Sequence, residues 1–399
     1  MESLFEKKEL LLRLTQTTLV REMTNRIDWG SQLLCLRGSR GVGKTTMMLQ
    51  YIKNNYKPGS REVLYCSLDS IYFSSHTLLD TAAEFYRNGG RHLFLDEVHK
   101  YKGWSREIKE IYDTYADMRV VMSGSSLLNI LSGDADLSRR CIPYDIQGLS
   151  FREFLEFYKK ICLPPVQLKD MLAAPADVCA AVLEKCQPLP LFQEYLKYGY
   201  YPFYLRQKSA YYVIVEQVVN YIIETELPQT FNVEPGMVRI LKAQLGTVAN
   251  SIPFEVDATK LATLIGAHRT TVVNYLYMLG KAKLLNLLFS DNKSVKNLQK
   301  PNKVYLENTN LMYALSNNAP QIGTVRETFA VNQLSAGHKV EYGKDRGDFK
   351  VDGQWIFEVG GEKKGFKQIA DIPNLFILAD SIEMPYGNKL PLWMIGFMY

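Results

Sequence analysis

The 399-residue sequence has no long apolar run, no C-x-x-C cysteine pair and no low-complexity tract. A membrane-spanning helix needs roughly 18 or more apolar residues, and the charged N-terminal segment does not have the pattern of a secretory signal. We therefore expect a cytoplasmic protein without a membrane partner. The six cysteines are too scattered for a zinc site or a disulfide scaffold, so reduced thiols are expected.

Length and composition are those of a folded protein with more than one domain. At roughly 100–200 residues per domain, 399 residues predict two or three domains. The formal net charge is +5. Residues 281–303 alone have a net charge of +5, because they contain one aspartate and six lysines. The lysines are Lys281, Lys283, Lys293, Lys296, Lys300 and Lys303. Basic charge is thus concentrated in this segment.

A glycine-rich segment follows an apolar run at residues 33–37. Its sequence, Gly38-Ser-Arg-Gly-Val-Gly-Lys-Thr45, fits G-x-x-x-x-G-K-[ST] and precedes apolar residues at helical spacing. Strand, glycine loop and helix are the context in which this motif wraps phosphates. We expect Lys44 to contact the β- and γ-phosphates of ATP and Thr45 to bind Mg²⁺. The expected nucleotide contacts are Gly38, Ser39, Arg40, Gly41, Val42, Gly43, Lys44, Thr45 and Thr46.

A second apolar run, at residues 92–95, ends in the adjacent carboxylates Asp96 and Glu97. This pattern is typical of a Walker B element. Asp96 would hold Mg²⁺, usually through water, and Glu97 would polarise the attacking water. Two solvated acids at a strand end are the alternative interpretation, which the position after a P-loop disfavours.

Two more strands are expected in this part of the chain. Residues 62–67 form one, between the two motif strands in the sequence. We infer that an inserted neighbour separates the motif strands in the sheet, as in nucleotide hydrolases with an adjacent catalytic glutamate. Residues 118–122 form the next strand and lead into a serine-rich segment.

Together these segments resemble a prokaryotic AAA+ ATPase family in which a P-loop domain precedes a C-terminal region of unassigned role. The resemblance spans most of the chain. It is carried by residues 38–46, Leu95-Asp-Glu-Val-His99 with Trp104, Ser123-Gly-Ser-Ser126, Arg140 ahead of residues 148–154, and residues 194–202 and 300–305. It implies binding and hydrolysis of ATP but supplies no cellular role.

The resemblance also implies the fold, which would be of the α/β class. Residues 1–150 would form a P-loop NTPase (AAA+-like) domain, a parallel sheet with helices on both faces. A helical lid would follow at residues 151–235, where apolar spacing becomes helical and prolines are frequent. A winged helix at residues 236–320 and a small α/β nuclease-like domain at residues 321–399 would complete the chain.

Two sensor residues are implied by the same resemblance. Ser123 is the candidate polar sensor of bound nucleotide, with Ser125 in reserve, although Ser125 is equally suited to cap a helix. Arg140 precedes a strand expected at residues 141–146. It could stabilise charge on the γ-phosphate, often from a neighbouring subunit, or belong with Arg139 to a solvated basic pair.

A helix-turn-helix is expected near residue 260. Asp257 can cap a helix that runs through Ile265, and a second helix is expected from about residue 271 to residue 279. A recognition helix touches DNA with outward residues near its start. These residues are Arg269, Thr270, Thr271 and Asn274.

Strands expected at residues 284–289 and 303–306 could form a wing, and Lys293 and Lys296 lie between them. Neutralisation of phosphates by these lysines would give DNA binding that depends on salt and tolerates many sequences. Packing against protein is the alternative role for a winged helix, and a solvated face is the alternative for the lysines.

From about residue 323 the order of expected elements resembles the PD-(D/E)XK nuclease fold, with helices at residues 326–334 and 366–370. Its metal site needs an acid on one strand and E-x-K on the next. Asp348 and Glu358 occupy the acid positions and Glu327 adds a third acid, but Gly360 stands at the lysine position. Lys363 and Lys364 lie in a nearby loop, which would place a lysine poorly. We therefore expect a degenerate, non-cleaving domain.

The leading hypothesis is an enzyme that hydrolyses ATP, with Mg²⁺, and couples the nucleotide state to the C-terminal region. DNA and further copies of the chain are candidate partners. The alternative is a slow-turnover switch, nucleotide-gated, that binds DNA or signals. A metal-dependent nuclease is a third and less favoured reading.

Overall fold

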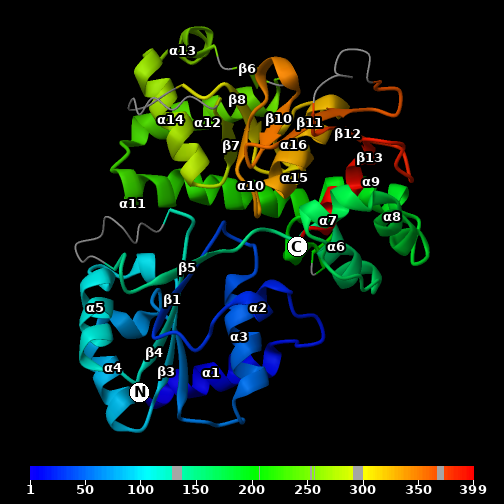
Figure 1. Ribbon diagram of the computed structural model, residues 1–399. Helices are drawn as coiled ribbons and strands as arrows, with labels where there is room; N and C mark the ends of the chain where they lie inside the picture. Colours follow the sequence, from blue (N-terminus) through cyan, green and yellow to red (C-terminus); the bar gives the residue numbers. More distant parts are fainter. Residues whose placement is uncertain (128–136, 206, 252–253, 256, 291–299, 366–372) are drawn as a thin grey trace. The chain divides into compact units, whose positions relative to one another are not determined.

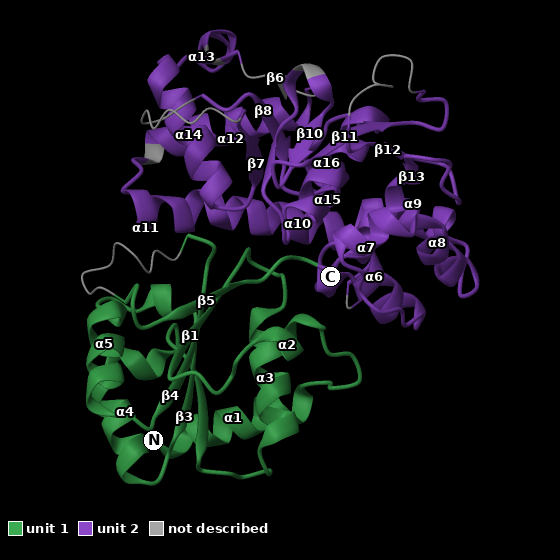
Figure 2. Ribbon diagram, viewed as in Figure 1, with its two compact units in different colours: residues 1–148 green, residues 149–399 purple. Residues whose placement is uncertain are grey.

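The computed structural model describes residues 1–127, 137–205, 207–251, 254–255, 257–290, 300–365 and 373–399. The chain forms two compact units, residues 1–148 (unit 1) and residues 149–399 (unit 2), which Figure 2 shows in different colours. None of the described helices is long and apolar enough to cross a membrane.

Unit 1 is built on a five-stranded parallel sheet with helices on both faces (Figure 1). Leu33 and Cys35 of the first strand pack into one core, and Leu34 and Leu36 pack into the other. Successive strand side chains point to opposite faces, so a sheet covered on both faces needs an unbroken apolar run. In sheet order the strands are β2 (Val63–Ser67), β3 (His92–Asp96), β4 (Arg119–Gly124), β1 (Leu33–Arg37) and β5 (Ile142–Asp145).

The helices of unit 1 divide between the two faces. Met47 and Met48 of α3 fill one core, and Phe85 of α4 and Ile108 of α5 fill the other. This sheet with its flanking helices confirms the expected P-loop NTPase fold for unit 1. The helices are α1 (Glu2–Leu14), α2 (Met23–Arg26), α3 (Lys44–Asn55), α4 (Leu78–Arg87) and α5 (Trp104–Thr114).

The strand between the two motif strands is β4, not the one that intervenes in the sequence. β4 pairs with β1 on one side and with β3 on the other, whereas β2 pairs with β3 alone and lies at the sheet edge. Sequence order could not show this, because parallel neighbours are joined by crossovers and need not be consecutive.

Unit 2 begins with helices that share a core with the end of the chain. Phe151 packs edge-on against Phe397, with ring centroids 5.7 Å apart. Ser150 Oγ (2.5 Å) and Arg152 Nε (3.0 Å) donate to the carbonyl oxygen of Tyr399. The segments assigned from sequence to a lid and to a C-terminal domain therefore pack together. The helices are α6 (Phe151–Phe154), α7 (Leu168–Ala173), α8 (Pro175–Leu183), α9 (Pro188–Tyr198), α10 (Tyr211–Tyr221) and α11 (Leu227–Phe231).

The middle of unit 2 combines helices with a small antiparallel sheet of order β6-β8-β7. Asp257 caps α13 by accepting from the N–H groups of Thr259 and Lys260. Helix α14 begins at Arg269, two residues earlier than expected. The elements are α12 (Pro235–Ala249), β6 (Phe254–Glu255), α13 (Ala258–Ile265), α14 (Arg269–Lys281), β7 (Leu285–Leu288), β8 (Lys303–Leu306) and α15 (Thr309–Leu315).

A five-stranded mixed sheet and helix α16 (Ile322–Leu334) form the last part of unit 2. β9, β10 and β11 are antiparallel, whereas β11, β12 and β13 are parallel. The helix expected at residues 366–370 lies outside the described residues, and β13 was not expected. The strands are β9 (Val340–Tyr342), β10 (Phe349–Val351), β11 (Trp355–Gly360), β12 (Leu375–Ala379) and β13 (Lys389–Pro391).

Candidate nucleotide site

The glycines of the loop between β1 and α3 are required by its backbone. Gly41 and Gly43 have φ angles of 87° and 99°, in the left-handed region that side chains disfavour. Gly38 faces another segment closely, since an added Cβ would lie 2.3 Å from the carbonyl oxygen of Ile146. The loop can therefore curl tightly at the start of α3, where free N–H groups and the helix dipole favour an anion.

Lys44 lies inside this loop and is 7% exposed. Its Nζ donates to the carbonyl oxygens of Gly38 (2.8 Å) and Ser39 (2.9 Å). These carbonyl acceptors are neutral, and a phosphate oxygen is a stronger acceptor for an ammonium group. The Lys44 ammonium group can thus exchange these two carbonyl oxygens for the oxygens of a bound phosphate.

Asp96 is the centre of a hydroxyl network at the end of β3. Its Oδ2 accepts from Thr45 Oγ1 (2.7 Å) and from Tyr65 OH (2.8 Å). Its Oδ1 accepts from Ser123 Oγ and from the Glu97 N–H. The structure therefore brings together Thr45, Asp96 and Ser123, which sequence reasoning proposed separately.

A hydroxyl and a carboxylate are oxygen ligands of the kind that Mg²⁺ binds together with phosphate and water. Thr45 and Asp96 supply this pair. Among the described residues, no group of three His, Cys, Asp or Glu side chains is placed to hold a metal ion. Thr45 and Asp96 thus fit a magnesium ion that would take its remaining ligands from phosphate and water.

Tyr65 is a member of the site that sequence reasoning missed. It lies on β2, which pairs with β3, and burial followed by the charge of Asp96 raises the pKa of its hydroxyl. The phenol is therefore a neutral donor to Asp96. Its only sequence signal is a polar ring tip in an apolar strand, and the sheet order is needed to place it beside Asp96.

Glu97 follows Asp96 in a left-handed backbone conformation, with φ 54° and ψ 41°. Its Oε2 lies 3.4 Å from Nε2 of His99. Burial, and then the charges of Lys100 and Lys44, lower the pKa of His99 to about 4. A neutral imidazole thus faces the carboxylate proposed to polarise water.

The other two sensor candidates lie in different surroundings. The N–H of Ser125 donates to Nδ1 of His99 at 3.5 Å. Arg140 pairs with Asp113 of α5, with Nε 2.9 Å from Oδ1, and its guanidinium lies 5.8 Å from the ring centre of Tyr112. Arg140 would have to leave Asp113 to reach a phosphate.

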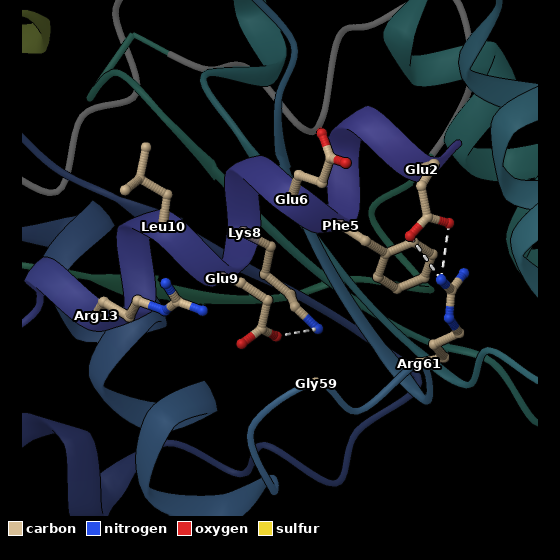
Figure 3. Close-up of a pocket in the computed structure, with 9 residues that line it drawn as sticks. All are labelled: Glu2, Phe5, Glu6, Lys8, Glu9, Leu10, Arg13, Gly59 and Arg61. Atoms are coloured by element: carbon tan, nitrogen blue, oxygen red, sulfur yellow. Dashed lines mark hydrogen bonds and ion pairs between the residues drawn. The ribbon is translucent and has the colours of Figure 1, made fainter.

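A pocket of about 410 Å³ lies elsewhere on unit 1, along α1 and the turn at Gly59 (Figure 3). It contains none of the residues of the glycine loop. Four of its charged side chains form two ion pairs, Arg61 with Glu2 at 2.6 Å and Lys8 with Glu9 at 3.1 Å. This pocket is therefore not the nucleotide site.

The acids of the nuclease-like region lie among lysines. Nζ of Lys303 is 3.3 Å from both Glu327 Oε2 and Asp348 Oδ1, and Nζ of Lys364 is 2.5 Å from Glu358 Oε1. Lys303, one of the six lysines of the basic segment at residues 281–303, is only 12% exposed. Glu327 on α16 and Asp348 directly before β10 come to it from distant parts of the sequence.

The candidate nucleic-acid contacts are only partly described. Arg269, Thr270 and Asn274 are exposed on α14. Lys293 and Lys296 lie outside the described residues.

Unit 1 therefore has the parallel sheet, glycine loop and strand-end carboxylates of an AAA-type P-loop nucleotide-binding domain. In agreement, residues 30–155 match a family model described as an AAA domain, and residues 189–322 match one described as a domain of unknown function (DUF8612). No curated protein is significantly similar to the chain.

One solved structure to which the chain is similar is that of PCH-2 from C. elegans. The sequence identity is 18% and the TM-score is 0.24, and the match covers 40% of this chain and 45% of that chain. The chain thus spans less than half the length of that structure.

Proposed function

We propose that unit 1 binds ATP with Mg²⁺ and hydrolyses it to ADP and phosphate. The observation that carries this proposal is the 2.7 Å hydrogen bond between Thr45 and Asp96. Thr45 follows the buried Lys44 in the sequence, and Asp96 precedes Glu97. Glycine-loop N–H groups and Lys44 would stabilise charge on the phosphates. A bound Mg²⁺ would neutralise further charge there. Glu97 would orient the attacking water, and Ser123 would hold Asp96.

A steady-state assay of phosphate release tests this proposal. Glu97→Gln should lower kcat by about 100-fold or more while the Kd for ATP stays within about threefold, because the base acts only in the transition state. Lys44→Ala should abolish binding, and Glu110→Gln, an exposed change on α5, should match wild type. Tight retention of ATP by wild-type protein with negligible turnover would instead support the alternative of a nucleotide-gated switch.

We propose that Arg140 acts on the ATP of a second copy of the chain. Its exposed pairing with Asp113 is a surface ion pair, which is weak enough to be exchanged. Arg140→Ala and Lys44→Ala proteins should each be inactive alone, yet a mixture of the two should regain activity, because each supplies what the other lacks. Arg139→Ala is the matched control. No recovery on mixing, together with a monomeric ATP-bound Glu97→Gln protein, would exclude action in trans.

We propose that residues 236–320 of unit 2 form a winged helix that contacts DNA. The order α12, β6, α13, α14, β7, β8 and the exposure of Arg269 and Asn274 support this. Mobility-shift titrations at low salt test this with two double variants. Binding should be weaker for Arg269→Glu/Asn274→Ala and for Lys293→Glu/Lys296→Glu. It should be unchanged for Lys169→Glu on α7. Equal binding by all variants would favour the protein-packing alternative. Stimulation of phosphate release by DNA would couple the two units.

We propose that residues 321–399 keep a nuclease-like fold without cleavage. Lys303 between Glu327 and Asp348 supports this, because its ammonium group neutralises the acids that a metal would need. Mg²⁺-dependent nicking of DNA that is lost in Glu358→Ala would contradict the proposal.

A further inference from the structure

His99 stands between Glu97 and the segment that follows β4. Its Nδ1 accepts from the Ser125 N–H at 3.5 Å, and its Nε2 lies 3.4 Å from Glu97 Oε2. Nε2 is buried and makes no hydrogen bond of its own. The imidazole therefore has one satisfied nitrogen and one that is aimed at a carboxylate.

The contacts of His99 determine which nitrogen carries the proton. A neutral imidazole has one donor and one acceptor nitrogen. Nδ1 is the acceptor, since it faces an N–H group, so Nε2 carries the hydrogen. The lowered pKa of about 4 keeps the ring neutral at pH 7. A buried N–H group without an acceptor is unfavourable, and a small rotation of the Glu97 side chain would satisfy it.

We propose that His99 is a positioning residue for ATP hydrolysis, whose Nε2–H holds the Glu97 carboxylate in one orientation while the Ser125 N–H fixes the ring. This role rests on the hydrolysis proposed for unit 1. Glutamate has a long side chain, and a water-polarising carboxylate must be held in place to be effective. Ser125 takes part in this contact through its backbone N–H.

Kinetics of three variants test this role. His99→Phe fills the same space without nitrogen and should lower kcat by about 10- to 100-fold, the size of one lost hydrogen bond to a charged group, while the Kd for ATP is unchanged. His99→Gln keeps a donor near the position of Nε2 and should retain most of the activity. His76→Phe, the same change at an exposed histidine outside the site, should resemble wild type. A kcat of His99→Phe equal to that of wild type, or a parallel loss of ATP binding, would overturn the proposal.

A double variant and a spectroscopic measurement separate this proposal from the proposed hydrolysis. His99→Phe should add nothing to Glu97→Gln, because the two residues act as one unit. In long-range ¹H–¹⁵N spectra of the histidine rings, His99 should be neutral with its proton on Nε2. That resonance should move in Glu97→Gln but not in Glu110→Gln. This readout needs no turnover, and a proton on Nδ1, or a resonance indifferent to Glu97, would refute the contact even if ATP were hydrolysed.

Discussion

Lys44 in unit 1 and Lys303 in unit 2 are both largely buried, but their ammonium groups have different partners. Lys44 donates to two backbone carbonyls, and Asp96, which contacts the adjacent Thr45, accepts from neutral hydroxyl groups. Lys303 instead lies between Glu327 and Asp348. A magnesium ion can replace neutral donors without leaving a buried charge unpaired. An ammonium group between two acids already occupies the position that a metal cation would take.

Titration behaviour follows the same division. Burial lowers the pKa of Lys303, but the adjacent charges of Glu327 and Asp348 raise it more, so the ammonium stays charged at neutral pH. Burial, and then the charge of Asp348, raise the pKa of Glu327. On acidification, Glu327 is thus expected to lose its charge at a higher pH than an exposed glutamate does.

Removal of the ammonium group from unit 2 should have the largest effect. Lys303→Met leaves two carboxylates that are only 14% and 18% exposed without a cation, and it should lower the unfolding free energy of unit 2 by about 3–5 kcal/mol at neutral pH. Urea unfolding followed by hydrogen exchange in β10 and β11 measures this. The Lys303→Met/Glu327→Gln double variant should recover part of the loss.

Lys260→Met is the matched control for this prediction. Lys260 is 87% exposed, and its Nζ is as far as 4.0 Å from Asp257 Oδ2. Its loss should therefore change stability by less than about 0.5 kcal/mol. Similar effects of the two changes would break the comparison, because Lys303 would then behave as a surface lysine.

Mild acid should destabilise unit 1 more than unit 2. Burial lowers the pKa of His92 to about 3 and that of His99 to about 4, from an ordinary value of 6.5. Below pH 6.5 the unfolded chain binds protons that the folded unit does not, so stability should fall by about 1.4 kcal/mol per pH unit for each histidine, down to about pH 4. The sign is opposite in unit 2, where burial raises the pKa of Glu307 and Glu327 and folded carboxyls take up protons first.

Urea unfolding at pH 7.0 and 5.5, followed by an exchange pulse at one common pH, compares the strands of the two units. The expected loss in unit 1 is about 2–3 kcal/mol. His92→Gln should halve the slope in unit 1. Equal slopes in the two units would show that the histidines do not govern acid sensitivity.

Local order was readable from the sequence, and partners from distant strands were not. The glycine loop lies between a strand and a helix that are consecutive, and Asp96 and Glu97 follow the apolar residues of one strand, so local patterns were enough to predict each segment. Tyr65 reaches Asp96 only because β2 pairs with β3. Lys303 meets its two acids across 24 and 45 residues. Such contacts depend on sheet order and on tertiary packing, which hydrophobic periodicity does not encode.

Tyr65→Phe tests whether the hydroxyl network of unit 1 can be exchanged. Loss of one buried hydrogen bond to a carboxylate should lower the unfolding free energy of unit 1 by about 1.5–3 kcal/mol. Binding of Mg²⁺ and ATP should change by less than about threefold, because Thr45 and Ser123 still contact Asp96 and the metal would replace the lost donor. Calorimetric titration measures the affinity. A loss of binding of more than tenfold would make Tyr65 a requirement of the metal site rather than an exchangeable donor.

The pair between Lys364 and Glu358 should have the smallest effect, although its atoms are close. Lys364 is 38% exposed, and its stem lies over Gly360, where an added Cβ would be 2.8 Å from that of Lys364. Lys364→Met keeps the apolar stem and should change the unfolding free energy by about 0–1 kcal/mol, as exposed ion pairs do. Lys363→Met, an exposed neighbour, is the matched control. A loss as large as that expected for Lys303→Met would mean that Lys364 and Glu358 form one continuous charge cluster with Lys303 and its two acids. The contrast between an exchangeable site in unit 1 and a neutralised one in unit 2 would then extend to a second lysine.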